Sequence, residues 1–446
     1  MTQPPIDGYT PNTGGSQPPG GEEPHAVPSH PGEPVTPGPA DGQGSQGEQG
    51  AQYLPPQGAQ QDPEQGVPQG PPQGMPQAPP PEYAQQPGMP PHGQPQGAPQ
   101  GPPQQWAWAR PQPQLVLTET EPLEYHRLYR GAPKYAWWKP LVVLVLAASI
   151  YFAMNIAFSL ALMPLLVAFD PDYVDTALFQ QIAPMLDTQH PWSIVLNLGT
   201  IALMIPAVLL AMLALGIRPT GRIWSVAGRI RWGLLLRTLG AALVGVIVMN
   251  GVGILIGVAM EGTGGDAALG SIAAERPDFD GTAALISFVI VLLLVPFQAA
   301  AEEVVFRGLF LQVLGSWMRS PWLAIGLSTL AFAMMHIYDI WGLLAVGLMG
   351  LTAAWVTWKT GGLEAAIAIH VLNNIAAFGF MAAGMGEDTG QVESSGGPEA
   401  LIGEVVGLAV FVWLVVRIFR KHGYGRERID SVWREQPVAV SGQGGV

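Results

Sequence analysis

Two adjacent glutamates and an arginine, Glu302, Glu303 and Arg307, lie inside an apolar run long enough to enter a membrane. An ionised side chain in hydrocarbon is costly unless it is paired or hydrated, so charges inside membrane segments are rare and are candidates for function. Two later apolar runs each contain one histidine, His336 and His370. A carboxylate and two imidazoles are the groups with which a hydrolase activates water and transfers protons.

Helical spacing divides the charged cluster into two parts. Residues four apart share one face of a helix, whereas adjacent residues point about 100° apart. Glu303 and Arg307 are therefore predicted to form an ion pair, which leaves Glu302 without a partner in its own helix. Glu302 is then the candidate general base, facing a cavity. The alternative is a charge pair whose only task is to lock two helices together.

Each histidine has a notable neighbour one helical turn away. Phe332 precedes His336 by four residues, and Asn374 follows His370 by four, so each pair shares a helix face. His370 and Asn374 suit an interhelical hydrogen-bond pair, which small polar groups often form in membranes. They equally suit a pair of donors for the oxyanion of a tetrahedral intermediate.

Three motifs on three separate apolar runs follow one another in the order Glu302-Glu303-x-x-x-Arg307, Phe332-x-x-x-His336, His370-x-x-x-Asn374. This order resembles the CAAX protease and bacteriocin-processing (CPBP, or Abi) family of intramembrane endopeptidases. The resemblance covers roughly Ala283 to Ala383, and it implies a membrane protease. The alternative within the same family is a non-catalytic membrane scaffold or a bacteriocin-immunity protein.

The resemblance also implies roles for these residues. Glu302 and His336 would activate a water, and His370 and Asn374 would stabilise the oxyanion. The supporting residues would be Glu303, Arg307 and Phe332. The expected activity is hydrolysis of a peptide bond, as in CAAX prenyl proteases, and the substrate itself cannot be read from the sequence.

The sequence leaves open whether a metal takes part. The three residues Glu302, His336 and His370 could hold a catalytic zinc with one open position. The two histidines lie on different runs, however, and there is no His-Glu-x-x-His motif. We favour the metal-free reaction, because His370 and Asn374 pair well as donors. The chain has no cysteine, which excludes thiolate nucleophiles and iron–sulfur clusters.

Membrane helices must position these groups. Beyond about Pro133, apolar runs of about 20 residues recur, which is the length that crosses a bilayer. We predict an all-α, polytopic membrane domain over residues 133–420. Its eight predicted spans are Pro140–Phe169, Trp192–Leu215, Leu234–Met260, Ala283–Trp317, Trp322–Ile337, Trp341–Trp358, Leu363–Ala383 and Leu401–Phe419.

Charges in the connecting loops predict the orientation, because Lys and Arg concentrate on the cytoplasmic side of a membrane. Basic residues precede the first span, follow the last, and lie between spans two and three, four and five, and six and seven. The alternate loops are acidic, with Arg276 as the exception. We therefore expect a multi-pass protein of the plasma membrane with both termini in the cytoplasm, and a water-filled cavity open to that side.

The ends of the chain have a different composition. Residues 1–112 are rich in Pro, Gln and Gly, with no Lys or Arg before Gln105, which predicts a disordered cytoplasmic tail. Residues 421–446 are expected to be a cytoplasmic C-terminal tail. The expected partners are membrane lipid and a peptide or protein substrate, with no nucleic acid. The partners of the N-terminal tail cannot be read from its composition.

Other membrane activities fit the sequence less well. A transporter that used these charges as a proton relay would be expected to show internal repeats, and none is visible. A rhomboid-like serine protease would need a Gly-x-Ser-x-Gly-type serine, which the sequence around Ser328 does not supply. An aspartyl protease would need paired aspartates within the spans, and none occur there.

Overall fold

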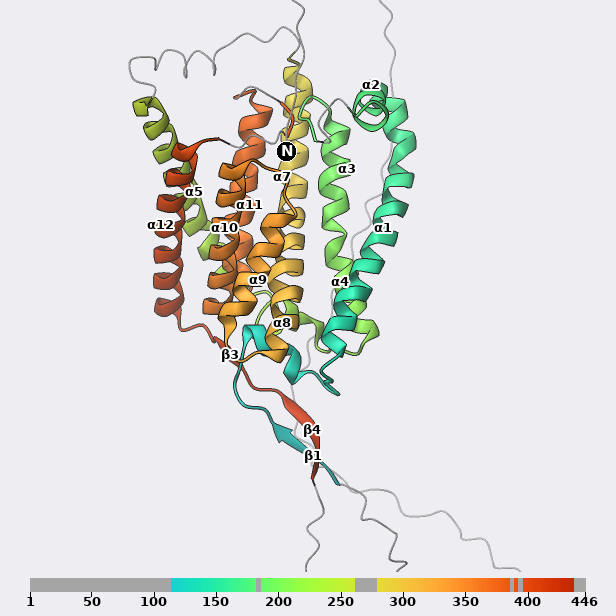
Figure 1. Ribbon diagram of the computed structural model, residues 1–446, viewed down its shortest axis with the longest axis vertical. Helices are drawn as coiled ribbons and strands as arrows, with labels where there is room; N and C mark the ends of the chain where they lie inside the picture. Colours follow the sequence, from blue (N-terminus) through green and yellow to red (C-terminus); the bar gives the residue numbers. More distant parts are fainter. Residues whose placement is uncertain (1–113, 182–185, 261–278, 386–388, 392–395, 437–446) are drawn as a thin grey trace, which may run out of the picture. The chain divides into compact units, whose positions relative to one another are not determined.

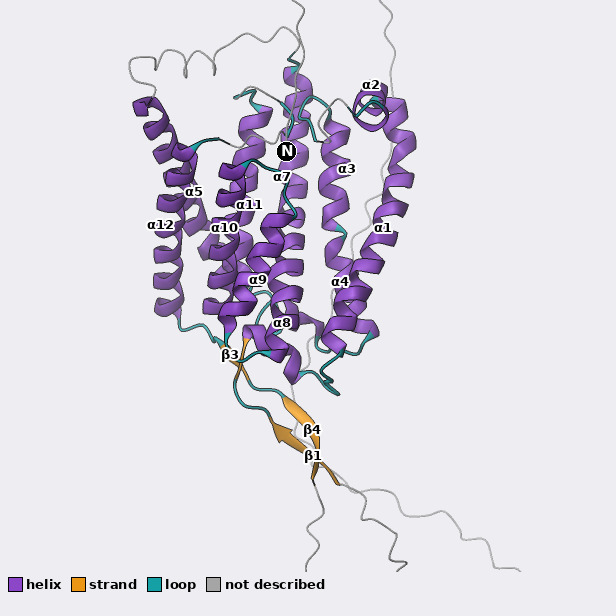
Figure 2. Cartoon of the chain, in the orientation of Figure 1, coloured by secondary structure: helices purple, strands orange, loops and turns teal. Residues whose placement is uncertain are grey.

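The computed structural model describes residues 114–181, 186–260, 279–385, 389–391 and 396–436. The predicted tail, residues 1–112, lies outside them. The described chain is mostly helical, as predicted (Figures 1 and 2). Within the described ranges, seven helices are long and apolar enough to cross a membrane. They are α1 (Lys139–Phe169), α3 with α4 (Pro191–Ala202 and Met204–Ala214), α5 (Trp232–Met260), the continuous run of α7, η5 and α8 (Gly281–Glu303, Val304–Phe310 and Leu311–Trp317), α10 (Ile340–Thr360), α11 (Glu364–Ala382) and α12 (Pro398–His422).

The run predicted as the fifth span, Trp322–Ile337, forms a shorter helix, α9 (Pro321–Met334). Its 14 residues extend about 21 Å, less than the roughly 30 Å of a bilayer's hydrocarbon core, so α9 does not cross it alone. Helix α9 packs against α10, and the rings of Trp322 and Trp358 lie 5.7 Å apart where the two helices meet the basic loops. His336 therefore follows the end of a helix rather than lying within one.

Several helix ends follow from local sequence. Helices α3, α9 and α12 begin with proline, whose missing N–H has no intrahelical partner at that position in any case. Helix α10 begins after Asp339, whose carboxylate accepts a 2.8 Å hydrogen bond from the backbone N–H of Gly342. Helices α10 and α12 both end at a glycine with a left-handed backbone, Gly361 and Gly423.

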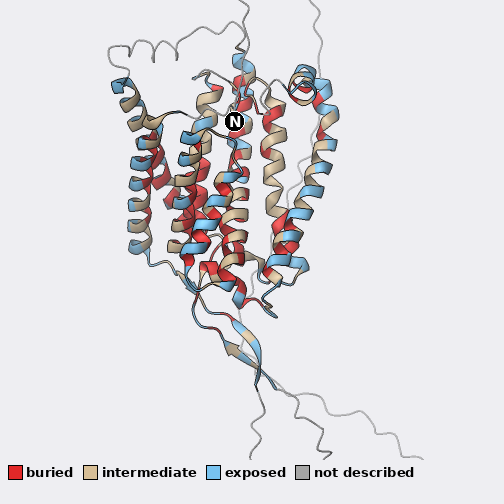
Figure 3. Ribbon diagram, viewed as in Figure 1, coloured by how far each residue is buried: buried red, intermediate tan, exposed pale blue. Residues whose placement is uncertain are grey.

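The helices pack side by side, and their buried residues lie on the sides that face one another, as Figure 3 shows. Helices α5 and α12 approach closely at Gly407. A Cβ atom placed there would lie 2.5 Å from the Cβ of Met249. Small residues allow such close approach between membrane helices, where apolar burial alone provides no drive for association.

The loops predicted to be basic gather at one end of the bundle. The α4–α5 connection, which contains η3 (Thr220–Ile223), meets the α10–α11 turn, and the N–H of Leu363 donates to the carbonyl of Trp224 at 2.9 Å. The α8–α9 turn contacts the segment that precedes α1, where Nε2 of His126 lies 3.1 Å from the carbonyl oxygen of Arg319. The alternation of loops predicted from charge is therefore present in the fold.

The described parts of the loops predicted to be acidic lie at the opposite end. There α1 is followed by α2 (Pro171–Tyr173) and η2 (Val174–Phe179). His190 Nδ1 lies 2.9 Å from Asp170 Oδ1, and the N–H of Thr188 donates to the carbonyl of Thr389 at 2.9 Å. Which end faces the cytoplasm stays a prediction from the charges.

Two short antiparallel strand pairs, which the sequence analysis did not predict, join the two ends of the described chain. Strand β1 (Gln114–Glu119) pairs with β4 (Ser431–Gln436), and β2 (Leu123–Glu124) pairs with β3 (Glu427–Arg428). Residues 427–436, predicted as part of a tail, are thus held against the segment before α1.

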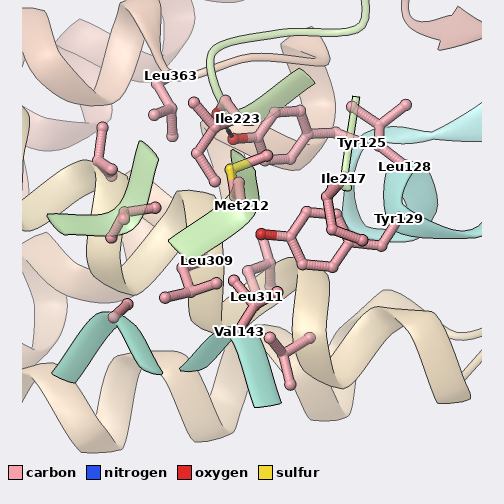
Figure 4. Packing of buried hydrophobic residues seen from close by; sticks show 14 of the residues in the cluster. Tyr125, Leu128, Tyr129, Val143, Met212, Ile217, Ile223, Leu309, Leu311 and Leu363 are labelled. Atoms are coloured by element: carbon pink, nitrogen blue, oxygen red, sulfur yellow. Dashed lines mark hydrogen bonds between the residues drawn. The ribbon is translucent and has the colours of Figure 1, made fainter. Parts of the chain in front are cut away.

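The segment η1 (Tyr125–Gly131) lies under the bundle at the basic end and is anchored by two buried tyrosines (Figure 4). Tyr125 donates a hydrogen bond to the carbonyl of Ile223. The guanidinium of Arg222, also buried, binds the carbonyl of Leu128 and the carboxylate of Asp430 on the strand side. We call η1 and these contacts the cap at the basic end. The cap connects the α4–α5 connection to the segments before α1 and after α12.

Candidate active site

The three charged residues of the first motif lie near the middle of the α7–η5–α8 run. Glu302 and Glu303 end α7, and Arg307 lies in η5, a π-helical stretch of seven residues. Wider helical turns of this kind are rare and frequently occur at functional sites. Pro296 is inside α7, one to two turns before the glutamates.

The predicted ion pair between Glu303 and Arg307 is present. Arg307 Nη1 donates to Glu303 Oε1 at 2.9 Å, and the side chains are 0% and 1% exposed. The guanidinium also donates from Nη2 to the carbonyl of Gly350 on α10 at 3.1 Å and lies 4.1 Å from the ring centroid of Phe332 on α9. A Cβ on Gly350 would lie 3.1 Å from Nη2, so glycine leaves the room that this contact requires. Arg307 thus links three helices.

His370 on α11 lies between the two glutamates of α7. Its Nδ1 is 2.8 Å from Glu303 Oε1, and its Nε2 is 3.5 Å from Glu302 Oε2. An ionised carboxylate only accepts hydrogen bonds, so the Nδ1 proton belongs on His370 and is donated to Glu303. The ring of His370 is only 3% exposed, so the Nδ1 hydrogen bond to Glu303 is made inside the bundle.

One carboxylate oxygen of Glu302 is held and the other is free. Glu302 Oε1 accepts a 2.7 Å hydrogen bond from Nε2 of Gln298. Glu302 Oε2 is buried and has no hydrogen-bond partner. The side chain as a whole is 12% exposed, which makes it the more accessible of the two glutamates. An unpartnered buried carboxylate oxygen is rare in a folded protein and calls for an explanation, which makes Glu302 Oε2 the candidate for a functional role.

Gln298 was not singled out by the sequence analysis, although it precedes Glu302 by four residues and so shares its helix face. It also reaches α11, where Asn374 Nδ2 donates to Gln298 Oε1 at 3.1 Å. Asn374 and His370 therefore lie toward the same side of α11, as their spacing predicted. The spacing of four from a charged residue was the available signal for Gln298.

His336 is the candidate least connected to this network. Its Nδ1 lies 2.9 Å from the carbonyl oxygen of Phe332 one turn earlier, and its ring is partly exposed. Phe332 is the link: its ring centroid lies 4.8 Å from that of His336 and 5.8 Å from that of His370, both edge-on. The structure thus brings Glu302, Glu303, Arg307 and His370 into direct contact. Asn374 is connected to Glu302 through Gln298, and His336 is connected to His370 through the ring of Phe332.

Tyr338 also approaches the site, and the sequence analysis did not name it as a site residue. Its ring stacks on that of His336 with centroids 5.7 Å apart, and its hydroxyl accepts a 2.7 Å hydrogen bond from Gln391 Nε2. Burial raises the pKa of the Tyr338 hydroxyl, the hydrogen bond from Gln391 opposes this, and the nearby negative charge of Glu302 adds to the rise. Tyr338 thus stays a neutral phenol beside the glutamate.

An apolar cavity of about 320 Å³ borders the site between α1, α4, η5 and α9. Met335, the neighbour of His336, lines it, and so does Phe306, whose ring lies 5.2 Å from that of Phe332. The site therefore has an apolar wall on the side of α9. The predicted water-filled cavity open to the cytoplasm stays a prediction.

Across the described ranges, no three His, Asp or Glu side chains converge closely enough to hold a metal ion. In particular, Nδ1 of His370 and Nδ1 of His336 are each engaged with a protein oxygen. Zinc binding by Glu302, His336 and His370 stays a prediction.

Comparison with known proteins finds a similarity for part of the chain. Residues 283–376 match the family model described as type II CAAX prenyl endopeptidase Rce1-like. The matched segment runs from α7 into α11 and contains every candidate residue from Gln298 to Asn374. The uncharacterized protein YyaK of Bacillus subtilis (strain 168) is 30% identical over 91 residues, which are 19% of this chain and 30% of that protein. The chain thus spans about a third of the length of that curated relative. No solved structure matches this chain.

Proposed function

Because residues 283–376 form a domain of the Rce1-like CAAX endopeptidase family within a multi-pass membrane protein, we propose that this chain is an intramembrane endopeptidase. It hydrolyses a peptide bond with a water that Glu302 and His336 activate. The observation that carries the proposal is the free Oε2 of Glu302, buried and 3.5 Å from Nε2 of His370.

The reaction begins with a water bound at Oε2 of Glu302. The carboxylate takes one proton from this water as the oxygen attacks the carbonyl carbon of the substrate, and the carbonyl oxygen becomes an oxyanion. The Nε2 of His336 is the second proton-transfer group of this proposal, because its Nδ1 is engaged by the Phe332 carbonyl.

Two donors on α11 suit the oxyanion. His370 is held at Nδ1 by Glu303, which leaves Nε2 to donate to the substrate oxygen when it carries a proton, and Asn374 retains a second amide N–H besides the one given to Gln298. Glu303 and Arg307 act behind His370 and fix the direction of its ring.

Collapse of the intermediate completes the reaction. The C–N bond breaks, the oxyanion returns to a carbonyl, and the proton held by Glu302 passes to the leaving nitrogen. The products are a carboxylic acid and an amine, and the proton that then passes from the acid to the amine gives a carboxylate and an ammonium group. The burial of these groups excludes bulk water, which strengthens the electrostatic contribution of His370 and Asn374.

The test is cleavage of an internally quenched peptide library by the purified full-length protein in lipid nanodiscs. Glu302→Gln is expected to lower the rate by about 10²- to 10⁴-fold, the contribution typical of a general base. Glu404→Gln is the matched control, since Glu404 is a buried carboxyl of α12 with no contact to the site network, and it should cleave like the wild type. Equal cleavage by Glu302→Gln and wild type would overturn the proposal, and no cleavage by the wild type would favour a non-catalytic role.

A further inference from the structure

Gln298 is a buried amide that touches both sides of the proposed reaction centre. Its side chain is 4% exposed and lies one turn before Glu302 on α7. It donates to Glu302 Oε1 at 2.7 Å and accepts from Asn374 Nδ2 at 3.1 Å. One side chain thus connects the carboxylate proposed as base with the amide proposed as oxyanion donor.

The direction of both hydrogen bonds is determined by chemistry. The ionised carboxylate of Glu302 only accepts, so the NH₂ group of Gln298 must face it. The carbonyl oxygen of Gln298 then faces Asn374 and requires a donor, so Asn374 presents its own NH₂ group. Rotating either amide by 180° would place two acceptors in contact within a buried site. The three side chains therefore have one consistent arrangement.

This arrangement decides which oxygen of Glu302 is free. Oε1 is occupied by Gln298, whereas Oε2 is unpartnered and lies beside Nε2 of His370. Without Gln298 the carboxylate could rotate about its Cγ–Cδ bond, and the amide of Asn374 would lose the acceptor that orients it. A misplacement of about 1 Å in such groups can reduce a rate 10²-fold.

We propose that Gln298 is a positioning residue for the hydrolysis proposed above, and the inference rests on that function. Gln298 fixes the plane of the Glu302 carboxylate and the direction of the Asn374 amide in one step, because it bonds to both. It acts through these residues and does not itself touch the substrate.

The first test replaces Gln298 with a residue of similar shape that cannot hydrogen-bond. Gln298→Met should lower kcat about 10- to 100-fold and leave KM within about twofold, since orientation affects the transition state more than substrate binding. The matched control is Gln312→Met. Gln312 is fully buried in α8 of the same helical run and donates to the carbonyl of Arg222 at 3.0 Å, away from the site. That variant should retain the kcat of the wild type.

The second test uses an introduced carboxyl. In Gln298→Glu, a protonated carboxyl can still donate to Glu302 and accept from Asn374, but an ionised one places two negative charges in contact. Activity should therefore approach that of the wild type at acidic pH and be lost as the pH rises. A residue with a merely structural role would give a pH–rate profile parallel to that of the wild type.

The outcomes separate this inference from the function on which it rests. If the wild type cleaves peptides and Glu302→Gln does not, the function stands, and an unchanged kcat in Gln298→Met then overturns the positioning role alone. If Gln298→Met fails to fold, the profile of Gln298→Glu decides. The inference is overturned, and Gln298 has a structural role, if the pH–rate profile of Gln298→Glu is parallel to that of the wild type or if this variant is inactive at every pH. Failure of both variants to fold has the same meaning.

Discussion

A single carboxylate oxygen, Oε1 of Glu303, lies 2.8 Å from Nδ1 of His370 while it also accepts a 2.9 Å hydrogen bond from Arg307. The ion pair within α7–η5 and the ring on α11 therefore share one atom. The stability of the protein and the orientation of the His370 ring should both depend on this oxygen. Substituting Glu303 alone and together with Arg307 can separate the two effects.

Removing either charge of the pair should destabilise the protein. Glu303→Gln leaves the guanidinium of Arg307 buried without an opposite charge, and loss of one partner of a buried pair costs about 3–5 kcal/mol. The double variant Glu303→Gln/Arg307→Met should lose much less than the sum of the single variants, because it leaves no unpaired charge. Unfolding free energies in mixed micelles measure this, and additive losses would contradict the pairing.

Restored stability should not restore activity. In the double variant a neutral amide replaces the carboxylate that holds the His370 proton, so the ring is less firmly oriented. We expect a rate about 10- to 100-fold below that of the wild type, the usual cost of removing a group that orients a functional histidine. Peptide cleavage at saturating substrate gives the comparison, and wild-type turnover in the double variant would remove Glu303 from the mechanism.

His336 should matter for turnover and little for stability. Its ring is partly exposed and its Nδ1 contacts only the nearby carbonyl of Phe332, so His336→Gln should change the unfolding free energy by less than about 1 kcal/mol. Its rate should fall about 10²-fold or more, as for loss of a proton-transfer group. His370→Gln is the contrasting variant, because His370 is buried between two glutamates and should lose both stability and rate. A fully active His336→Gln would exclude His336 from the reaction.

Chelation should leave activity unchanged. The described histidines and carboxylates offer no set of three that could hold a metal, and a reaction based on Glu302 needs none. Activity should survive dialysis against a strong chelator of divalent metals and should not rise when Zn²⁺ is added. Loss on chelation followed by recovery with Zn²⁺ would show that a metal takes part.

Acid should weaken the cap at the basic end through His126. Burial lowers the pKa of His126 below its ordinary value of 6.5, an effect that its hydrogen bond to the Arg319 carbonyl only partly opposes. At a pH between the lowered pKa of the folded state and 6.5, the unfolded chain binds more protons at this histidine than the folded chain does. The stability that depends on neutral His126 is therefore fully present above pH 6.5 and falls as the pH drops below it. The slope contributed by one such histidine is at most about 1.4 kcal/mol per pH unit.

The check on this titration is a pair of histidine variants. Melting of the wild type and of His126→Gln is compared at pH 7.5 and 5.5, with the exposed His422→Gln as the control. The drop in stability should be smaller in His126→Gln and unchanged in His422→Gln. An equal drop in all three proteins would assign the pH dependence to other groups.

Continuous apolar runs made the long helices predictable from the sequence. The predicted limits of α1, α5, α10 and α11 agree with the structure within two residues, because each run meets charged or turn-forming residues at its ends. The break between α3 and α4 at Leu203 and the early end of α9 were not predicted. The first follows from Pro206, which has no N–H to donate to the carbonyl of Ala202, so a proline was the available signal.

The site shows the same division between local and distant contacts. The pair Glu303–Arg307 follows from spacing along one helix and was predicted. The contact of His370 with both glutamates depends on how α11 faces α7, which spacing within one helix does not determine. The strands were missed for the same reason, since β1 and β4 are short and are paired only through the fold.

The pairing of β1 with β4 has a consequence for biosynthesis. Thr118 and Val432, which share a hydrogen bond, are 314 residues apart, with every membrane helix between them. A ribosome exposes β1 before α1 and β4 after α12, so the ribbon closes only after α12 has left the ribosome. Paired strands lie on one side of a membrane, so closure also requires an even number of crossings between them, which α9 and the segment that follows it must complete. The ribbon therefore forms only on a chain whose helices up to α12 have been synthesised and inserted in this way.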